Sequence, residues 1–176
     1  IFEDKGGKNL HLEHIEDEIL NYGVDGGRAS INFVRSLRDM FAGATRSSIN
    51  MTVKWDGAPA IFAGIDPEDN KFFVGKKSVF NVEPQLYKTN ADIDKYTSGD
   101  LNAKFKVALR EFPKLGIKGV LQGDLMFTDD VSTTSIDGKK YYTFQPNTIV
   151  YAVDVDSDFG RQVKSAKIGV VWHTTY

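Results

Sequence analysis

The N-terminal part of the chain has apolar residues at the spacing of amphipathic helices. They recur every three or four positions over residues 12–20 and again over residues 29–41, with charged residues between them. Residues 21–27 separate the two runs and contain three glycines, which favour a helix stop and a restart. The pattern therefore predicts a helical N-terminal extension over residues 1–45 that packs on the structure following it.

From residue 46 onward the pattern changes to short apolar runs, several of which alternate with polar residues as in half-buried strands. The expected strands cover residues 49–53, 59–64, 71–74, 119–127, 129–136, 139–144, 147–155 and 167–173. One clear helical stripe lies over residues 101–112, with Asp100 as its expected N-cap and Pro113 marking its end. Helices followed by strand hairpins predict an α+β fold.

Polar stretches separate these elements. Residues 66–70 are a strong turn signal, and Asp137-Gly138 is typical of the two-residue turn of a hairpin. Residues 81–99 predict a loop with a short helix, and residues 156–165 predict a polar loop. We expect residues 46–176 to form one core domain.

Composition limits the classes of protein that fit this chain. Of its 176 residues 41% are apolar and 26% are charged, which is ordinary for a soluble domain. The chain has no cysteine, which excludes disulfides, thiolate zinc sites and thiol catalysis and suits a cytoplasmic location. No apolar run is long enough to span a membrane, and the start shows no secretory signal. The formal net charge of −2 means that any contact with nucleic acid must come from a local basic patch.

The segment with the most specific chemistry is Lys54-Trp55-Asp56-Gly57, which follows one expected strand and precedes another. Glycine permits the turn that this position needs. A lysine made neutral by burial or by nearby cations can attack a carbonyl carbon or a phosphorus atom. The alternative is a surface lysine at a strand end, paired with the neighbouring aspartate.

This segment resembles the K-x-D-G motif of the covalent nucleotidyltransferase superfamily, which comprises ATP-dependent DNA ligases, RNA ligases and mRNA capping enzymes. The resemblance implies that Lys54 carries the nucleotide and that Asp56 holds the lysine or a metal ion. It also implies that Trp55 and Gly57 lie at the nucleotide site. In this superfamily the core is ATP-grasp-like, with antiparallel sheets flanked by helices and the nucleotide between the sheets.

Further segments resemble later parts of the same superfamily, in the expected order. A basic residue after the motif lysine contacts the nucleotide there, which implies this role for Lys76 or Lys77. The alternative is a hairpin tip with two solvated lysines.

Tyr151, in an alternating run that is typical of a strand, would be the aromatic residue that stacks on the base. The alternative for Tyr151 is a place in the core, and Phe144 is the second choice for the stacking role.

The stretch from Gly119 to Phe127 is apolar apart from Gln122-Gly123-Asp124. A carboxylate at the centre of a buried strand needs a partner, such as a lysine or a metal-bound nucleotide. The stretch resembles the superfamily's third motif, which implies that Asp124 binds the sugar or the metal ion. The alternative is a structural ion pair within the sheet.

Two later motifs of the superfamily, E-G-h-h-h-K and K-x-K (h is an apolar residue), have no clear counterpart. No Glu-Gly precedes Val170-Val171, and Lys164 and Lys167 match the last motif only loosely. We therefore expect the chain to be a piece of a longer protein, truncated at its C-terminus.

The resemblance implies a polynucleotide ligase that uses ATP and Mg²⁺, forms a covalent lysyl-AMP and transfers AMP to a 5′-phosphate end of RNA or DNA. Large phages often encode such enzymes, which favours a viral or bacterial source. Two alternatives stay open. One is a non-catalytic module of the same fold that binds a nucleotide or nucleic acid. The other is a structural or interaction protein of a phage.

Overall fold

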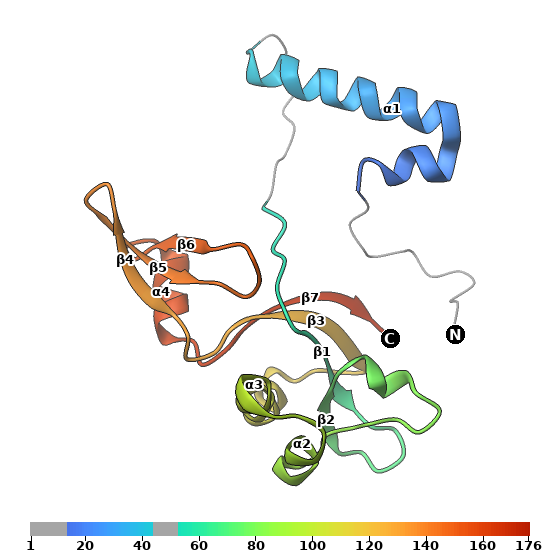
Figure 1. Cartoon of the computed structure of the whole chain (residues 1–176), viewed down its shortest axis with the longest axis vertical. Coiled ribbons are helices and arrows are strands. Elements are labelled where there is room, and N and C mark those ends of the chain that lie inside the picture. Colours follow the sequence, from blue (N-terminus) through green and yellow to red (C-terminus); the bar gives the residue numbers. More distant parts are fainter. Residues whose placement is uncertain (1–13, 44–52) are drawn as a thin grey trace. The chain divides into compact units, whose positions relative to one another are not determined.

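The chain combines helices with antiparallel sheets and divides into two units, Ile1–Lys54 and Trp55–Tyr176 (Figure 1). The structure is a computed structural model and describes residues 14–43 and 53–176. Most of the strand expected at residues 49–53 lies outside the described residues, and Val53 itself is not in a strand. The α+β class predicted from the sequence is confirmed.

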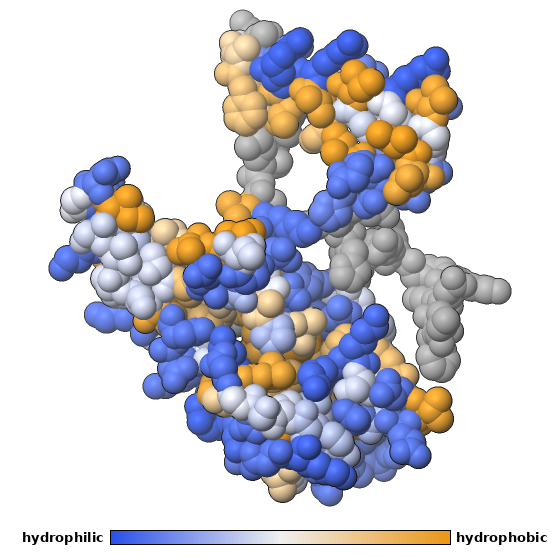
Figure 2. All heavy atoms as spheres, in the orientation of Figure 1, coloured by the Kyte–Doolittle hydropathy of each residue, from blue (hydrophilic) through white to orange (hydrophobic). Residues whose placement is uncertain are grey.

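The first unit is built on one kinked helix, α1 (Asp17–Phe41). The kink lies at Gly23, whose φ of 57° and ψ of −130° are outside the helical region. The helix folds back so closely there that a Cβ atom on Gly26 would lie 1.8 Å from the carbonyl oxygen of Glu18. The predicted stop and restart is therefore confirmed at Gly23, although most of residues 21–27 are helical. Figure 2 shows that many apolar side chains of α1 lie on the surface of this unit.

The second unit contains a four-stranded antiparallel sheet in the order β2-β1-β3-β7. Its strands are β1 (Ala60–Ile65), β2 (Phe72–Gly75), β3 (Val120–Phe127) and β7 (Gly169–Thr175). The predicted turn between β1 and β2 is confirmed, and Asp66 accepts the amide hydrogen bond of Asn70 that closes it. Strands β3 and β7 extend past β1 toward a second sheet (Figure 1).

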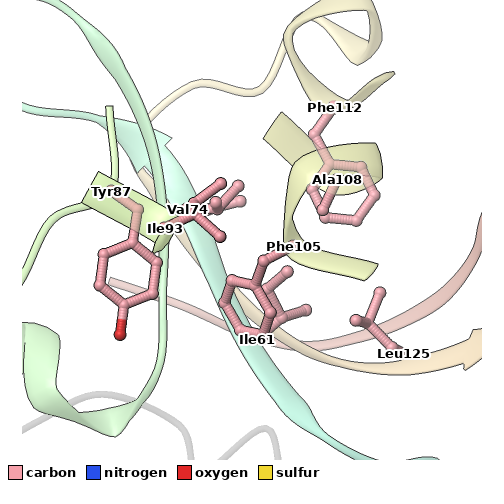
Figure 3. Packing of buried hydrophobic residues seen from close by; sticks show 9 residues of the cluster. Ile61, Val74, Tyr87, Ile93, Phe105, Ala108, Phe112 and Leu125 are labelled. Atoms are coloured by element: carbon pink, nitrogen blue, oxygen red, sulfur yellow. The ribbon is translucent and has the colours of Figure 1, made fainter. Parts of the chain in front are cut away.

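Helices α2 (Asn90–Tyr96) and α3 (Gly99–Glu111) contribute to a core on one face of this sheet. The short 3₁₀ helices η1 (Lys77–Phe80) and η2 (Phe112–Leu115) follow β2 and α3. The centre of the core is fully buried and consists of Ile61, Ala63, Val74, Tyr87, Ile93, Phe105, Ala108, Phe112 and Leu125 (Figure 3). The predicted helical stripe is therefore confirmed. The predicted N-cap is wrong, because the helix begins earlier, with Ser98 at its cap position and Asp100 in its first turn.

The second sheet has the order β4-β5-β6 and is also antiparallel. Its strands are β4 (Ser132–Ile136), β5 (Lys139–Phe144) and β6 (Tyr151–Asp154). The turn between β4 and β5 has positive φ at both Asp137 and Gly138, at 49° and 79°. These angles are those of a type I′ turn, so the predicted hairpin is confirmed.

Helix α4 (Asp158–Ser165) corrects the polar loop expected at residues 156–165. The hydroxyl oxygen of Ser157 accepts the amide hydrogen bond of Gly160 at 2.9 Å and caps the helix. Val163 then packs with Met126, Phe127, Phe144 and Val153 in a second buried cluster. This cluster joins the far ends of the first sheet to the second sheet.

None of the helices within residues 14–43 and 53–176 has both the length and the apolar character needed to span a membrane.

Candidate functional site

The residues that directly follow the K-x-D-G pattern run along β3. The amide of Ala58 donates to the carbonyl of Leu125 at 3.1 Å, and the amide of Leu125 donates to the carbonyl of Pro59 at 3.0 Å. The next residue, Ala60, begins β1 opposite Asp124. The segment thus continues the ladder between β1 and β3 and places its turn beside Asp124.

Gly57 lies so close to β3 that a larger residue does not fit. Its amide donates to Oδ2 of Asp124 at 3.3 Å. A Cβ atom on Gly57 would lie 2.5 Å from the carbonyl oxygen of Leu125 and 2.9 Å from Cβ of Asp124. The glycine therefore allows the direct contact between the turn and the Asp124 carboxylate.

The backbone of Asp56 is held by the second sheet. The hydroxyl of Tyr151 accepts a hydrogen bond from the Asp56 amide at 2.9 Å and donates to the carbonyl of the same residue at 2.9 Å. Asn147 donates from Nδ2 to that carbonyl at 3.2 Å. The residue itself is exposed, so its backbone is fixed while its carboxylate faces water.

Trp55 anchors the same turn through its indole ring. The ring stacks on Tyr151 at a centroid distance of 4.9 Å and an interplanar angle of 25°. Its ring centroid also lies 6.3 Å from that of Phe144 and 5.5 Å from that of Phe159. Stacked rings of this kind add stability beyond the area that they bury. Trp55 and Tyr151 therefore fix the position of the turn, and the expected role of Tyr151 in stacking on a base stays a prediction.

Asp124 has a partner that the sequence analysis missed, His173 on β7. Nε2 of His173 lies 3.0 Å from Oδ2 of Asp124, and the two side chains are only 20% and 15% exposed. In the pairing of β3 with β7, Asp124 lies opposite Val171, and the register shifts between Gln122 and Gly123. This irregularity is consistent with His173 reaching the same face of the sheet as Asp124. The expectation of a polar partner for Asp124 is confirmed, and among residues 14–43 and 53–176 the ion-pair partner is a histidine and not a lysine.

A family model matches residues 9–176, and it describes a family of unknown function (DUF6267). The chain belongs to DUF6267. The match includes described residues of both units, α1 and all of the strands. No curated protein and no solved structure matches the chain.

The lysines predicted for the site in this DUF6267 chain lie on different elements. Lys54 is exposed and is the last residue of the first unit, directly before Trp55. Lys76 and Lys77 follow β2 at the end of the sheet where β1 begins, because Gly75 pairs with Phe62. The Lys76 ammonium donates to the carbonyl of Tyr96 at 3.4 Å, at the end of α2, and Lys77 is exposed.

Asp124 is the residue predicted to bind a metal ion. Within the described part of the chain, no three or more His, Asp or Glu side chains are grouped so that they could hold a metal. Mg²⁺ does not require such a group, because it commonly uses one or two carboxylates together with water and substrate phosphates. Asp124 uses Oδ2 for its contacts with both Gly57 and His173. The residues therefore fit an Mg²⁺ ion that arrives with a nucleotide.

A groove of about 520 Å³ opens beside the same turn. It is mostly apolar and lies between the end of α3 and α4, with Trp55, Phe112 and Phe159 among its lining residues. Neither Asp124 nor His173 lines it. Trp55 therefore separates two environments, the polar turn beside Asp124 and this apolar groove.

Proposed function

We propose that this chain is a covalent nucleotidyltransferase of the polynucleotide ligase type. One observation carries the proposal, the hydrogen bond between Gly57 and Asp124, which are 67 residues apart in the sequence. The two segments that resemble the first and third motifs of that superfamily are thus in direct contact. Two antiparallel sheets with flanking helices are also compatible with an ATP-grasp-like core.

In the proposed reaction Lys54 attacks the α-phosphorus of ATP. The bond between Nζ and phosphorus forms, the bond from this phosphorus to the bridging oxygen breaks, pyrophosphate leaves and the amine loses a proton. An oxygen of a nucleic-acid 5′-phosphate then attacks the same phosphorus and releases the lysine, which regains a proton. A 3′-hydroxyl finally attacks the activated 5′-phosphate, AMP leaves and the strand is sealed.

The residues around the turn have separate roles in this proposal. Trp55 and Tyr151 hold the turn, and Gly57 allows Asp124 to approach it. Asp124 binds the sugar or the metal ion, and Lys76 or Lys77 contacts the phosphates. A bound Mg²⁺ would neutralise charge on the phosphates. Such an enzyme would act on RNA or DNA ends in the cytoplasm.

A second candidate is a module that binds a nucleotide without turnover. It is favoured by the sequence of β7 and the residue before it, Ile168-Gly169-Val170-Val171-Trp172-His173. This run has the glycine and the three following apolar residues of the pattern E-G-h-h-h-K, with isoleucine in place of glutamate and histidine in place of lysine. The first difference means that residue 168 has no carboxylate.

Intact-protein mass spectrometry after incubation with Mg²⁺ and ATP, and separately with GTP, tests the proposal. We expect a mass gain of one nucleoside monophosphate, abolished in Lys54→Ala and retained in a control, Lys139→Ala, which changes an exposed lysine of the second sheet. A gain that survives Lys54→Ala would refute the assigned nucleophile. Nucleotide binding without any gain would favour the second candidate.

A further inference from the structure

A cluster of aromatic side chains lies beside the Asp124–His173 pair, on the face of the first sheet opposite the core with α2 and α3, here called the open face. Part of this face is covered, because Phe62, Phe73 and Val79 form a buried cluster there. The aromatic cluster consists of Phe62, Phe80 and Tyr176. The ring of Phe80 lies 5.0 Å from that of Phe62 and 5.1 Å from that of Tyr176. Phe62 is 3% exposed, whereas Phe80 is 52% and Tyr176 is 57% exposed. One buried ring thus supports two rings whose surfaces face water.

The strand register places this cluster on the same face as Asp124. Gln122 and Asp124 are two residues apart on β3, so their side chains leave the same face at a spacing of about 6.8 Å. Phe62 is directly opposite Gln122, and Ala60 is directly opposite Asp124. Tyr176 pairs with Val120 through two backbone hydrogen bonds and donates from its hydroxyl to Oε1 of Gln122 at 2.7 Å. The K-x-D-G turn, Asp124 and the aromatic cluster therefore follow one another along a single face.

The chemistry of the cluster matches a nucleobase. Exposed aromatic rings stack on bases of any sequence, because every base has a π face. The Gln122 amide supplies N–H donors and an acceptor oxygen at the edge of the rings, and such groups can bond to the edge of a base. The spacing between Gln122 and Asp124 is of the same order as that between the base and the sugar of one nucleotide. A single nucleotide can thus span both positions.

We propose that Tyr176 and Phe80 form the subsite for the base of the bound nucleotide, with the sugar beside Asp124 and His173 and the phosphates at the turn. This inference rests on the proposed function. It assigns the base to the open face of the first sheet and leaves Tyr151 to hold the turn.

Equilibrium binding of ATP, measured by calorimetry in a Lys54→Ala background without Mg²⁺, tests the subsite apart from any covalent step. We expect Tyr176→Leu and Phe80→Leu each to weaken ATP binding by about 5- to 100-fold, the range for loss of one stacking contact. The control Tyr141→Leu changes a half-buried ring on the second sheet and should leave the affinity within about twofold. Inorganic tripolyphosphate has no base, so its affinity should be equal in all variants.

Three results would overturn the subsite. They are unchanged ATP affinity in both variants, an equal loss for ATP and tripolyphosphate, and a loss of the same size in the control. If ATP binds with unchanged affinity in these variants and the wild type still gains a nucleotide, the subsite is wrong and the proposed function stands. If the wild type neither binds ATP nor gains a nucleotide, both proposals fail. Far-UV circular dichroism and thermal unfolding of each variant check that the fold is retained.

Discussion

The two faces of the first sheet differ in what they bury. One face is covered by α2 and α3. Its side chains join the buried core around Phe105, whose fully buried residues are at most 1% exposed. The other face has a smaller buried cluster, Phe62, Phe73 and Val79. Beside it lie half-buried polar side chains, Gln122, Asp124 and His173, and exposed aromatic rings. Leu125 and Asp124 are neighbours on β3, and the alternation of a strand sends them to opposite faces.

Stability and the proposed chemistry therefore depend on alternate residues of the same strand. Core residues are replaced at a high cost in free energy because they leave a cavity. Gln122, Asp124 and His173 on the other face are only half-buried, so their substitution leaves no fully enclosed cavity. Substitutions on the two faces should therefore have separable effects.

The largest effect is expected from Leu125→Ala, which should lower the free energy of unfolding by about 2–5 kcal/mol. Asp124→Asn keeps the shape of the side chain and should lower the free energy of unfolding by no more than about 1.5 kcal/mol, the usual net contribution of a hydrogen bond. The same substitution should abolish the nucleotide adduct. Urea unfolding followed by tryptophan fluorescence gives both values, since both tryptophans lie in the second unit. Equal destabilisation by the two substitutions would mean that Asp124 contributes as much to the fold as Leu125.

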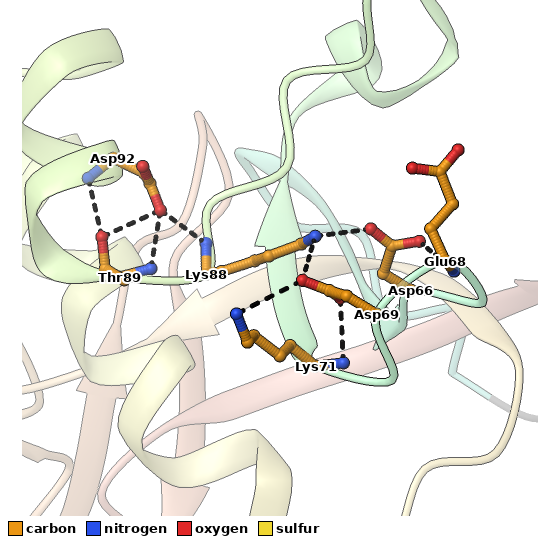
Figure 4. Close-up of polar contacts among 7 residues, drawn as sticks. All are labelled: Asp66, Glu68, Asp69, Lys71, Lys88, Thr89 and Asp92. Atoms are coloured by element: carbon orange, nitrogen blue, oxygen red, sulfur yellow. Dashed lines mark hydrogen bonds and ion pairs between the residues drawn. The ribbon is translucent and has the colours of Figure 1, made fainter.

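A smaller effect concerns an ion pair that the proposed chemistry does not use. The ammonium of Lys88 lies 2.6 Å from Oδ2 of Asp66 and 2.9 Å from Oδ2 of Asp69 (Figure 4). The hydrogen bond from Lys88 lowers the pKa of the Asp66 carboxyl below that of an ordinary aspartate, and the pKa of Asp69 is lowered in the same way. Stabilisation by a carboxyl of lowered pKa is present above the unfolded pKa and is lost as the pH falls through the folded value.

Lys88→Met should therefore be less stable than the wild type at pH 7, and this difference should shrink as the pH falls below about 4. The loss should be smaller than that of Leu125→Ala, because Lys88 is 23% exposed and water screens the pair. Thermal unfolding of both proteins from pH 2 to pH 7 measures this difference in stability. Nucleotide adduct formation at pH 7 should be unchanged. A constant difference across this range would argue against the assigned ion pair.

The smallest effect is expected at Tyr87 in the core. Its ring is fully buried, and among the residues that the structure describes its hydroxyl has no hydrogen-bond partner. Figure 3 shows this hydroxyl pointing away from the other labelled side chains. Removing an unsatisfied buried hydroxyl avoids its desolvation cost, so Tyr87→Phe should leave stability within about 1 kcal/mol or raise it. A larger destabilisation in urea unfolding would mean that the hydroxyl has a partner in solution.

The elements that could be predicted are those with strong local signals. Strand β3 has apolar residues at both ends of an eight-residue run that Gln122-Gly123-Asp124 interrupts. The turn at Asp137-Gly138 needs the positive φ that both residues adopt. Helix α4 could not be predicted, because only Phe159 and Val163 of its eight residues are large and apolar. Its one local signal was the capping serine, Ser157, and tertiary packing of Val163 supplied the rest.

The candidate site was predicted only in part, for a similar reason. The K-x-D-G turn and Asp124 were found from their own sequence, but His173 became visible only through the pairing of β3 with β7. That pairing joins residues far apart in the chain and includes a shift of register, which no local pattern encodes. Tyr151 was selected as an aromatic residue of the site, and its hydrogen bonds to the Asp56 backbone depend equally on long-range structure.

The hydrogen bonds of the turn have a consequence for movement. Asp56 and Gly57 are consecutive residues, yet Asp56 is bonded to Tyr151 of the second sheet and Gly57 to Asp124 of the first. A change in the angle between the two sheets would therefore strain the peptide unit between these residues or one of the two hydrogen bonds. Lys54 lies two positions before Asp56, so such a change would act on the chain close to the lysine.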